Sequence, residues 1–287
     1  MHAAMPRDVS QTALGTAYLR AAHQLLDAEP RILNDPIAPR LLGEDAPRRI
    51  AEAAEWYRTP EACELRSHVV LRSRYCEDRL ALAVQRGVSQ YIILGAGFDT
   101  FVFRQPSWAA ALRIVEVDHP GTQERKRLYM TRAGLAMPKN AGFAQVDFEH
   151  ESLADGLSRH DISTDKLTFF SWLGVTMYLN ESAIDAALSC MARFPQGSEV
   201  VLTFRGPVPR EIDVSMRARA ELARRVASLG EPFVSFFDPE QLNAKLLSAG
   251  FRTVNFLRPE EAEAQYFRGR PRDIPAPRGT RIASAIR

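Results

Sequence analysis

The sequence is short of cysteines, of long apolar runs and of net charge. Its three cysteines, Cys63, Cys76 and Cys190, are far apart and lack the spacing of metal ligands, so they predict free thiols, a reducing compartment and no metal site. No segment reaches the roughly 20 apolar residues that span a bilayer, and the N-terminus carries no apolar leader. The formal net charge of +2 argues against a nucleic acid or a membrane surface as partner. These features predict a soluble, cytoplasmic protein.

The length of 287 residues suits one large α/β domain with an added helical part. Apolar residues recur at helical spacing through most of residues 12–85. We predict that residues 1–88 form an N-terminal helical cap and that residues 89–287 form the core, with a substrate-side insertion at about 206–240. The predicted cap helices cover residues 12–27, 37–42, 46–58 and 61–85.

Strands and helices are predicted to alternate after residue 89. Short apolar runs predict strands at residues 91–94, 113–118, 143–147, 167–173, 199–204 and 251–257. Helices are predicted between them at residues 101–111, 120–132, 184–193, 214–229 and 239–249. Residues 281–287 are predicted to add an antiparallel edge strand at the C-terminus. This alternation predicts an α/β fold with a mostly parallel, doubly wound sheet that binds ligands at the carboxyl ends of its strands.

A glycine turn follows the first predicted strand. In Tyr91–Arg104, YIILGAGFDTFVFR, the apolar run ends at Gly95-Ala96-Gly97, and Asp99-Thr100 is suited to begin a helix. Strand, glycine turn and helix are the start of a nucleotide-binding βαβ unit, in which backbone N–H groups face the ligand. A dinucleotide-binding turn would carry a third glycine at the position of Thr100. The turn therefore fits a pyrophosphate poorly, and a tight turn without a ligand is the plain alternative.

The next two predicted strands each end in a carboxylate. Asp118 lies about twenty residues beyond the glycines, where a carboxylate can accept hydrogen bonds from both hydroxyls of a ribose. Asp147 ends the third predicted strand and can accept from an exocyclic amine, while the ring of Phe148 covers an adenine face. Capping of the next helix would explain either acid alone. Together, at successive strand ends, they predict a nucleoside pocket.

A set of short motifs runs through most of the chain. It comprises Thr12-Ala13 with Arg20-Ala21, Asp35-Pro36, LRSRY at 71–75, ILGAGFDT at 93–100, EVDHP at 116–120, VDF at 146–148, GVTMYL at 174–179 and YFRGR at 266–270. With these motifs the chain resembles the leucine carboxyl methyltransferase-like family of S-adenosylmethionine-dependent methyltransferases, in particular its bacterial branch. The resemblance implies a class I methyltransferase (Rossmann-like) fold and S-adenosyl-L-methionine as cofactor, with N-terminal helices that close over it.

The resemblance also implies which arginines hold the cofactor. Arg72, with Arg74 as a second choice, would bind the methionine carboxylate, because guanidinium groups suit that anion. Arg20 is a further candidate for the same region. Without the resemblance, Arg72 would be interpreted as a solvated side chain on a long helix.

The remaining cofactor contacts would come from Gly95-Ala96-Gly97, from Asp118 with its neighbour His119, and from Asp147 and Phe148. Two positions depart from the family pattern. Many relatives carry an arginine where Phe101 stands, and an acid where Leu173 precedes the GVTMYL motif. In the eukaryotic enzymes that acid helps to hold the cofactor, so the cofactor role of the strand end at Leu173 is in question.

The acceptor side is less defined by the sequence. Tyr178 is the candidate for positioning a methyl acceptor, with core packing as the alternative. His23 and His119 are more typical of structural or solvated residues than of a base, which favours an acceptor oxygen that is already anionic, such as a carboxylate. Three phenylalanines either line an apolar acceptor pocket or belong to the core: Phe233, Phe236 and Phe237.

The sequence thus predicts an S-adenosylmethionine-dependent O-methyltransferase that acts on a carboxyl or hydroxyl group of a small molecule, as in secondary metabolism. Two alternatives stay open: an NAD(P)-dependent oxidoreductase on a Rossmann fold, and a non-catalytic S-adenosylmethionine-binding regulatory protein. The expected partner is the small-molecule acceptor, and the expected assembly is a monomer or a homodimer.

Overall fold

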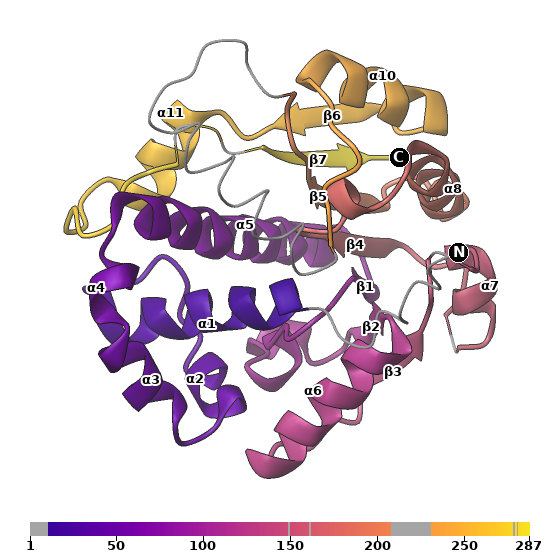
Figure 1. The fold of residues 1–287 in the computed structure, drawn as a ribbon. Coiled ribbons are helices and arrows are strands. Elements are labelled where there is room, and N and C mark those ends of the chain that lie inside the picture. Colours follow the sequence, from indigo (N-terminus) through magenta and orange to yellow (C-terminus); the bar gives the residue numbers. More distant parts are fainter. Residues whose placement is uncertain (1–10, 149, 161, 208–230, 278, 280) are drawn as a thin grey trace, which may run out of the picture.

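One seven-stranded sheet with helices on both faces forms the centre of the molecule (Figure 1). The computed structural model describes residues 11–148, 150–160, 162–207, 231–277, 279 and 281–287. The strands are β1 (Gln90–Leu94), β2 (Arg113–Asp118), β3 (Ala141–Gln145), β4 (Thr168–Trp172), β5 (Glu199–Thr203), β6 (Thr253–Phe256) and β7 (Ile282–Ile286). Their order is β3-β2-β1-β4-β5-β7-β6, and among these described strands β7 alone runs opposite to the direction of the other six. The predicted mostly parallel sheet with an antiparallel C-terminal strand is confirmed.

The prediction that this C-terminal strand lies at the edge is wrong. Strand β7 pairs with β5 on one side and with β6 on the other. The residues of β7, IASAI, are mostly small or apolar and are buried between the two helical layers. Strand β6 instead alternates between exposed and half-buried positions. The half-exposed pattern of β6 is the one typical of an edge strand.

The two faces of the sheet pack against different helices. Along β1, Tyr91 and Ile93 face α5 (Pro60–Gln85), while Ile92 and Leu94 face the opposite layer. Successive side chains of a strand point to opposite faces, so a fully apolar strand fits a sheet covered on both sides. The opposite layer consists of α7 (Leu153–Ser158), α8 (Glu181–Met191) and α10 (Pro239–Ala249). Helix α6 (Pro120–Arg132) follows β2, and α11 (Pro259–Ala262) continues into a π-helical turn at Glu263–Phe267.

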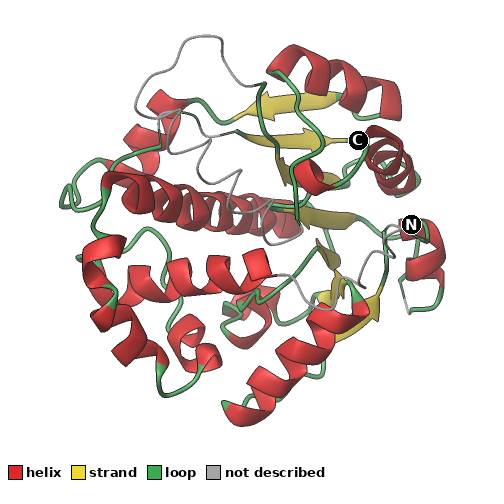
Figure 2. Cartoon of the chain, in the orientation of Figure 1, coloured by secondary structure: helices red, strands yellow, loops and turns green. Residues whose placement is uncertain are grey.

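All of the described secondary structure before β1 is helical (Figure 2). The short helices α2 (Ile37–Leu42), α3 (Ala46–Glu52) and α4 (Ala54–Tyr57) join α1 (Gln11–Leu26) to α5. Buried residues of α1, α2, α3 and α5 share one apolar cluster. The single helix predicted at 46–58 is instead broken at Ala53. None of the helices within the described ranges is long and apolar enough to cross a bilayer.

The helix predicted at residues 101–111 is wrong. Two short 3₁₀ turns stand there, Phe101–Phe103 and Ser107–Ala109, with Pro106 between them. Proline lacks the N–H that a helix interior needs, so it prevents a continuous helix. The glycine turn is therefore not followed by a long helix with an N-terminal dipole. The helix predicted at 214–229 lies outside the described residues.

Candidate cofactor site

The glycine turn lies where the strand order reverses, beside the adjacent parallel strands β1 and β4. Gly95 has a φ of +63°, and a Cβ added to it would lie 2.2 Å from Cγ2 of Val175. Gly97 has a φ of +50°, and its added Cβ would lie 3.1 Å from the Cβ of Ala13 on α1. A larger residue at Gly95 would therefore be strained and would collide with the loop after β4. The turn forms a tight cradle between that loop and the first helix.

Asp118 reaches from the end of β2 to this cradle. Its Oδ2 accepts a hydrogen bond from the Gly97 N–H at 2.5 Å, and its Oδ1 accepts from the His119 N–H at 2.7 Å. Burial raises the pKa of Asp118, and these two hydrogen bonds oppose that rise. Each carboxylate oxygen retains a lone pair, so the group can still accept from a ligand hydroxyl.

His119 and Asp147 also meet at this edge. Nδ1 of His119 accepts from the Gly121 N–H at 3.2 Å and caps α6, so the ring proton is assigned to Nε2. That Nε2 lies 3.7 Å from Oδ2 of Asp147, which also contacts Nδ1 of His150 at 2.7 Å. Asp147 follows β3 by two residues, because the strand begins and ends earlier than predicted. The half-buried ring of Phe148 packs against the core cluster that includes α7 and α8.

Arg72 lies at the carboxyl end of β4. Gly174, with a φ of +78°, has no side chain there, and a Cβ added to it would lie 2.7 Å from Nη1 of Arg72. The guanidinium is half-buried and, within the described part of the chain, makes no hydrogen bond or ion pair. Burial and the nearby Arg20 lower the pKa of Arg72 to about 10. A half-buried cation without a counter-ion is a site for an anion.

Arg20 differs from Arg72 because its charge is already paired. Its Nε lies 3.2 Å from Oδ2 of Asp35, and its Nη2 donates to the Phe98 carbonyl beside the glycine turn. The fully buried Asp35 also accepts from the Thr100 hydroxyl at 2.6 Å and lies 3.4 Å from Nε of Arg104. This network fixes α1 against the glycine turn and positions Arg20 beside Arg72.

Arg74 and Leu173 do not join the site. Arg74 lies two residues after Arg72, on a different side of α5, where it is exposed and pairs with Asp78 at 2.9 Å. Two residues turn an α-helix by more than half a circle, so the two arginines cannot point the same way. The side chain of Leu173 packs against the apolar cluster on the α5 face of the sheet.

Tyr178 lies on the loop after β4, where the charge of Arg72 on α5 acts on its phenol. Its ring centroid is 5.3 Å from that of Phe233, and the Arg205 guanidinium carbon lies 4.1 Å above the Phe233 ring. The three predicted phenylalanines therefore separate: Phe233 is half-buried beside Tyr178, Phe236 is exposed and Phe237 belongs to the core.

Thr12 and Glu231 were not predicted as site residues, but they lie at the N-terminal end of α1 on the same side as Tyr178. The hydroxyl of Thr12 donates to Oε2 of Glu231, and Oε1 of Glu231 accepts from the Gln11 N–H at 2.9 Å. Thr12 is part of the family motifs, but nothing in the sequence pairs it with a residue 219 positions away. His23, in contrast, is fully buried within the helical cap and bound to Asp27, as a structural histidine would be.

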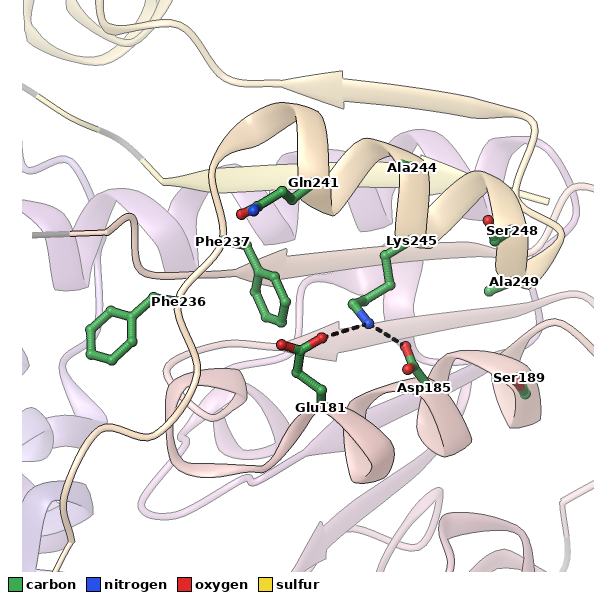
Figure 3. A pocket seen from close by; sticks show the side chains of 10 residues that line it. All are labelled: Glu181, Asp185, Ser189, Phe236, Phe237, Gln241, Ala244, Lys245, Ser248 and Ala249. Atoms are coloured by element: carbon green, nitrogen blue, oxygen red, sulfur yellow. Dashed lines mark hydrogen bonds and ion pairs between the residues drawn. The ribbon is translucent and has the colours of Figure 1, made fainter.

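A separate groove of about 520 Å³ lies between α8 and α10 (Figure 3). Lys245 reaches across it to Asp185 at 2.7 Å and to Glu181 at 3.3 Å. This groove lies in the outer helical layer and shares no residue with the glycine cradle, so it is not part of the candidate site.

We expect Asp118→Ala to weaken binding of S-adenosylhomocysteine by about 1.5–3 kcal/mol, the range for a hydrogen bond to a charged group. The sheet should stay folded, since the pairing of β2 with β1 and β3 does not involve the carboxylate. Isothermal calorimetry measures the affinity, and circular dichroism checks the fold. If the variant unfolded while its folded fraction kept full affinity, Asp118 would be a structural residue only.

Comparison with known proteins agrees with this geometry. The sequence pattern of the family described as leucine carboxyl methyltransferase matches residues 13–192, well over half of the chain. The chain belongs to the leucine carboxyl methyltransferase family. The match covers most of α1, the glycine turn, Asp118 and the loop after β4.

Several relatives of this chain are named for methyl transfer from S-adenosyl-L-methionine. A protein of Bacillus subtilis (strain 168), YktD, provisionally named as an S-adenosyl-L-methionine-dependent methyltransferase, is 28% identical over 93% of this chain and 94% of its own length. A similarly named Streptomyces coelicolor protein, SCO7813, is 28% identical over 71% of this chain and 73% of its own. The chain is thus a methyltransferase that depends on S-adenosyl-L-methionine.

Solved structures show the same fold. A protein from Thermobifida fusca, provisionally described as a methyltransferase, matches with a TM-score of 0.54 and 18% identity, over 86% of this chain and 91% of that one. A DUF574 family protein from Streptomyces avermitilis also has a TM-score of 0.54, with 16% identity over 86% of this chain and 93% of that one.

Proposed function

We propose that this member of the leucine carboxyl methyltransferase family transfers the methyl group of S-adenosyl-L-methionine to a carboxyl or hydroxyl oxygen of a small molecule. The proposal depends most on the surroundings of the Arg72 side chain. Its guanidinium is half-buried and unpaired among the described residues, at the strand end beside the glycine cradle. An amino-acid carboxylate is the anion that S-adenosylmethionine would bring there.

The described residues fit the rest of the cofactor. Asp118 would accept from the ribose hydroxyls, and the Gly95–Gly97 turn leaves room for the backbone to approach the ligand. Asp147 and Phe148 would hold the adenine end, beyond His119. When bound, the cofactor supplies a methyl group on a sulfonium, whose carbon–sulfur bond breaks with the electron pair remaining on sulfur.

The work of the protein in such a transfer is to orient the acceptor and to remove water from it. The Tyr178 and Phe233 rings pack together, the charge of Arg72 acts on the Tyr178 phenol, and the Arg205 guanidinium lies over the Phe233 ring. The site lies at the carboxyl edge of the sheet, and α1 packs over it through Ala13 and Arg20. These residues support a small organic acceptor.

The oxidoreductase alternative fits the site less well. The position of the third glycine is held by Thr100, which is buried and donates to Asp35. The 3₁₀ turn that follows offers no long helix N-terminus for a pyrophosphate. A dinucleotide would therefore lack both features that hold its phosphates.

Calorimetry with S-adenosylmethionine, S-adenosylhomocysteine and NAD tests the proposed function. We expect binding of the first two and no binding of NAD. Incubation with labelled S-adenosylmethionine and a metabolite extract, followed by mass spectrometry, should then yield a methylated small molecule. Binding of NAD instead of the sulfonium cofactor would contradict the proposal. Tight cofactor binding without any methylated product would favour a regulatory protein.

A further inference from the structure

The residues proposed to hold the cofactor lie along one half of the carboxyl edge of the sheet. Asp147 follows β3, Asp118 ends β2, the glycine turn follows β1, and Arg72 packs against Gly174 after β4. In the order β3-β2-β1-β4-β5-β7-β6, these are the first four strands (Figure 1). A cofactor held there leaves the end of β5 and the start of β7 for the methyl acceptor.

Two arginines stand at this second half of the edge. Arg205 comes two residues after β5, and Arg281 comes directly before β7. Because β7 is antiparallel to β5, with Ile282 opposite Thr203, both arginines lie at the same edge. The Phe204 N–H donates to the Arg281 carbonyl at 3.1 Å and extends this pairing. Neighbouring strands are about 4.8 Å apart, so β7 begins roughly 10 Å from the end of β4.

Arg281 packs against a glycine in the same way as Arg72 does. A Cβ added to Gly206 would lie 2.7 Å from Nη2 and 2.8 Å from Cζ of Arg281, so only a glycine admits the guanidinium there. Among the non-glycine residues that the structure describes, Arg281 alone has a left-handed φ, of 45°. This conformation is unfavourable for a residue with a Cβ, and such strain is typical of functional sites.

Aromatic rings surround both guanidinium groups. Cζ of Arg281 lies 5.8 Å from the centre of the Phe204 ring, and Cζ of Arg205 lies 4.1 Å from the centre of the Phe233 ring. The Phe233 ring in turn packs on Tyr178, with 5.3 Å between the ring centres. Cations combined with ring faces suit a ligand that carries an anionic group on an aromatic body.

The segment that carries Phe233 is attached on both sides of this residue. Glu231 accepts a hydrogen bond from the Thr12 hydroxyl on α1. The Val234 N–H donates to the Met177 carbonyl at 2.8 Å, on the loop after β4. These two attachments hold Phe233 between α1 and the loop after β4, so the aromatic part of this region is fixed before any acceptor binds.

We propose that Arg281 binds the carboxylate of the methyl acceptor, and that the acceptor is a small aromatic acid. The inference rests on the proposed function, since it takes the cofactor to occupy the other half of the edge. A guanidinium can form two parallel N–H···O bonds with a carboxylate, which would fix the orientation of the acceptor as well as bind it. Arg205 adds a second positive charge to the same half.

Pairs of ligands that differ only in this charge test the proposal. Phenylacetate and 4-hydroxyphenylacetate are each compared with their neutral amides, by ligand-observed NMR titration of the protein saturated with S-adenosylhomocysteine. We expect each acid to bind roughly tenfold or more tightly than its amide, as for a hydrogen bond to a charged group. Arg281→Gln should abolish this preference, and Arg281→Lys should restore part of it.

Gly206→Ala displaces the guanidinium without removing its charge, because the added Cβ would collide with it. This variant should also lose the preference for the acids. Arg252→Gln is the matched control. Arg252 is exposed at the opposite end of β7, where its N–H donates to the Ile286 carbonyl, so the preference should stay at the wild-type value.

Calorimetry with S-adenosylhomocysteine on the same proteins separates the two proposals. Cofactor affinity should be unchanged in Arg281→Gln, and a large loss would show that Arg281 holds the cofactor instead of the acceptor. Acids that bind the wild type no better than their amides, or a preference that survives Arg281→Gln, would also overturn the inference while the proposed function stands. A wild type that does not bind S-adenosylhomocysteine would contradict the proposed function and the inference with it.

Discussion

Arg72→Ala is expected to weaken binding of S-adenosylhomocysteine roughly 10- to 150-fold, which corresponds to about 1.5–3 kcal/mol. The guanidinium makes no other ion pair among the described residues, so the variant loses a ligand contact and no internal one. Folding should be unaffected or slightly improved, because a half-buried cation whose pKa is lowered to about 10 is removed. Isothermal calorimetry measures the change in affinity.

The matched control is Arg74→Ala. Arg74 has the same side chain on the same helix, but it is exposed and paired with Asp78. Exposed pairs of this kind contribute little. Cofactor affinity should therefore stay at the wild-type value. Equal losses in both variants would show that α5 as a whole, and not the Arg72 guanidinium, determines binding.

Asp27→Ala is expected to lower the free energy of unfolding by about 3–5 kcal/mol, the usual cost of breaking a buried ion pair from one side. Asp27 lies inside the helical cap, where it receives hydrogen bonds from Nε and Nη2 of Arg66 at 2.8 and 2.7 Å. Nδ1 of His23 contacts it at 2.7 Å. Without the carboxylate, the buried Arg66 charge keeps, among the residues that the structure describes, only the carbonyl of Tyr57 and the sulfur of Cys63 as partners.

Chemical denaturation at several pH values measures this effect. Burial alone would raise the pKa of Asp27, but its bonds to His23 and Arg66 hold the pKa below its ordinary value of 3.8. The pair is therefore fully stabilising above that pH and loses its contribution as the pH falls through the lower, folded-state pKa. The difference between wild type and Asp27→Ala should shrink in acid. Glu52→Ala, which breaks the exposed pair with Arg48, should have little effect. A similarly small change for Asp27→Ala would contradict the role of the pair.

Most of the fold follows from local sequence patterns. Apolar runs such as Tyr91–Leu94 locate the parallel strands, and caps such as Asp238 with Gly250 bound the helix α10. The wrong predictions come from local sequence signals that compete with each other. Pro106 overrides the helix expected after Thr100, and the small residues of β7 suit an inner strand although they stand at the end of the sequence.

The candidate site was predictable only in part. Strand-end positions place Asp118 beside Gly97 without further information, since β2 ends at Asp118 and Gly97 comes shortly after the parallel neighbour β1. The choice between Arg72 and Arg74 depends on the rotation of α5 against β4, which the mixed polarity of that helix leaves undetermined. Glu231 meets Thr12 only because α1 packs across the sheet edge, and no local pattern records that packing.

Arg72 is the residue that we propose binds the amino-acid carboxylate of the cofactor. Methylthioadenosine tests this proposal most directly, because this molecule keeps the adenosine and the sulfur and lacks the amino-acid group. Calorimetry should compare S-adenosylhomocysteine and methylthioadenosine in the wild type and in Arg72→Ala. We predict that the variant loses affinity for S-adenosylhomocysteine roughly 10- to 150-fold and changes its affinity for methylthioadenosine by less than about twofold. Equal losses for the two ligands would contradict the assignment of Arg72 to the carboxylate.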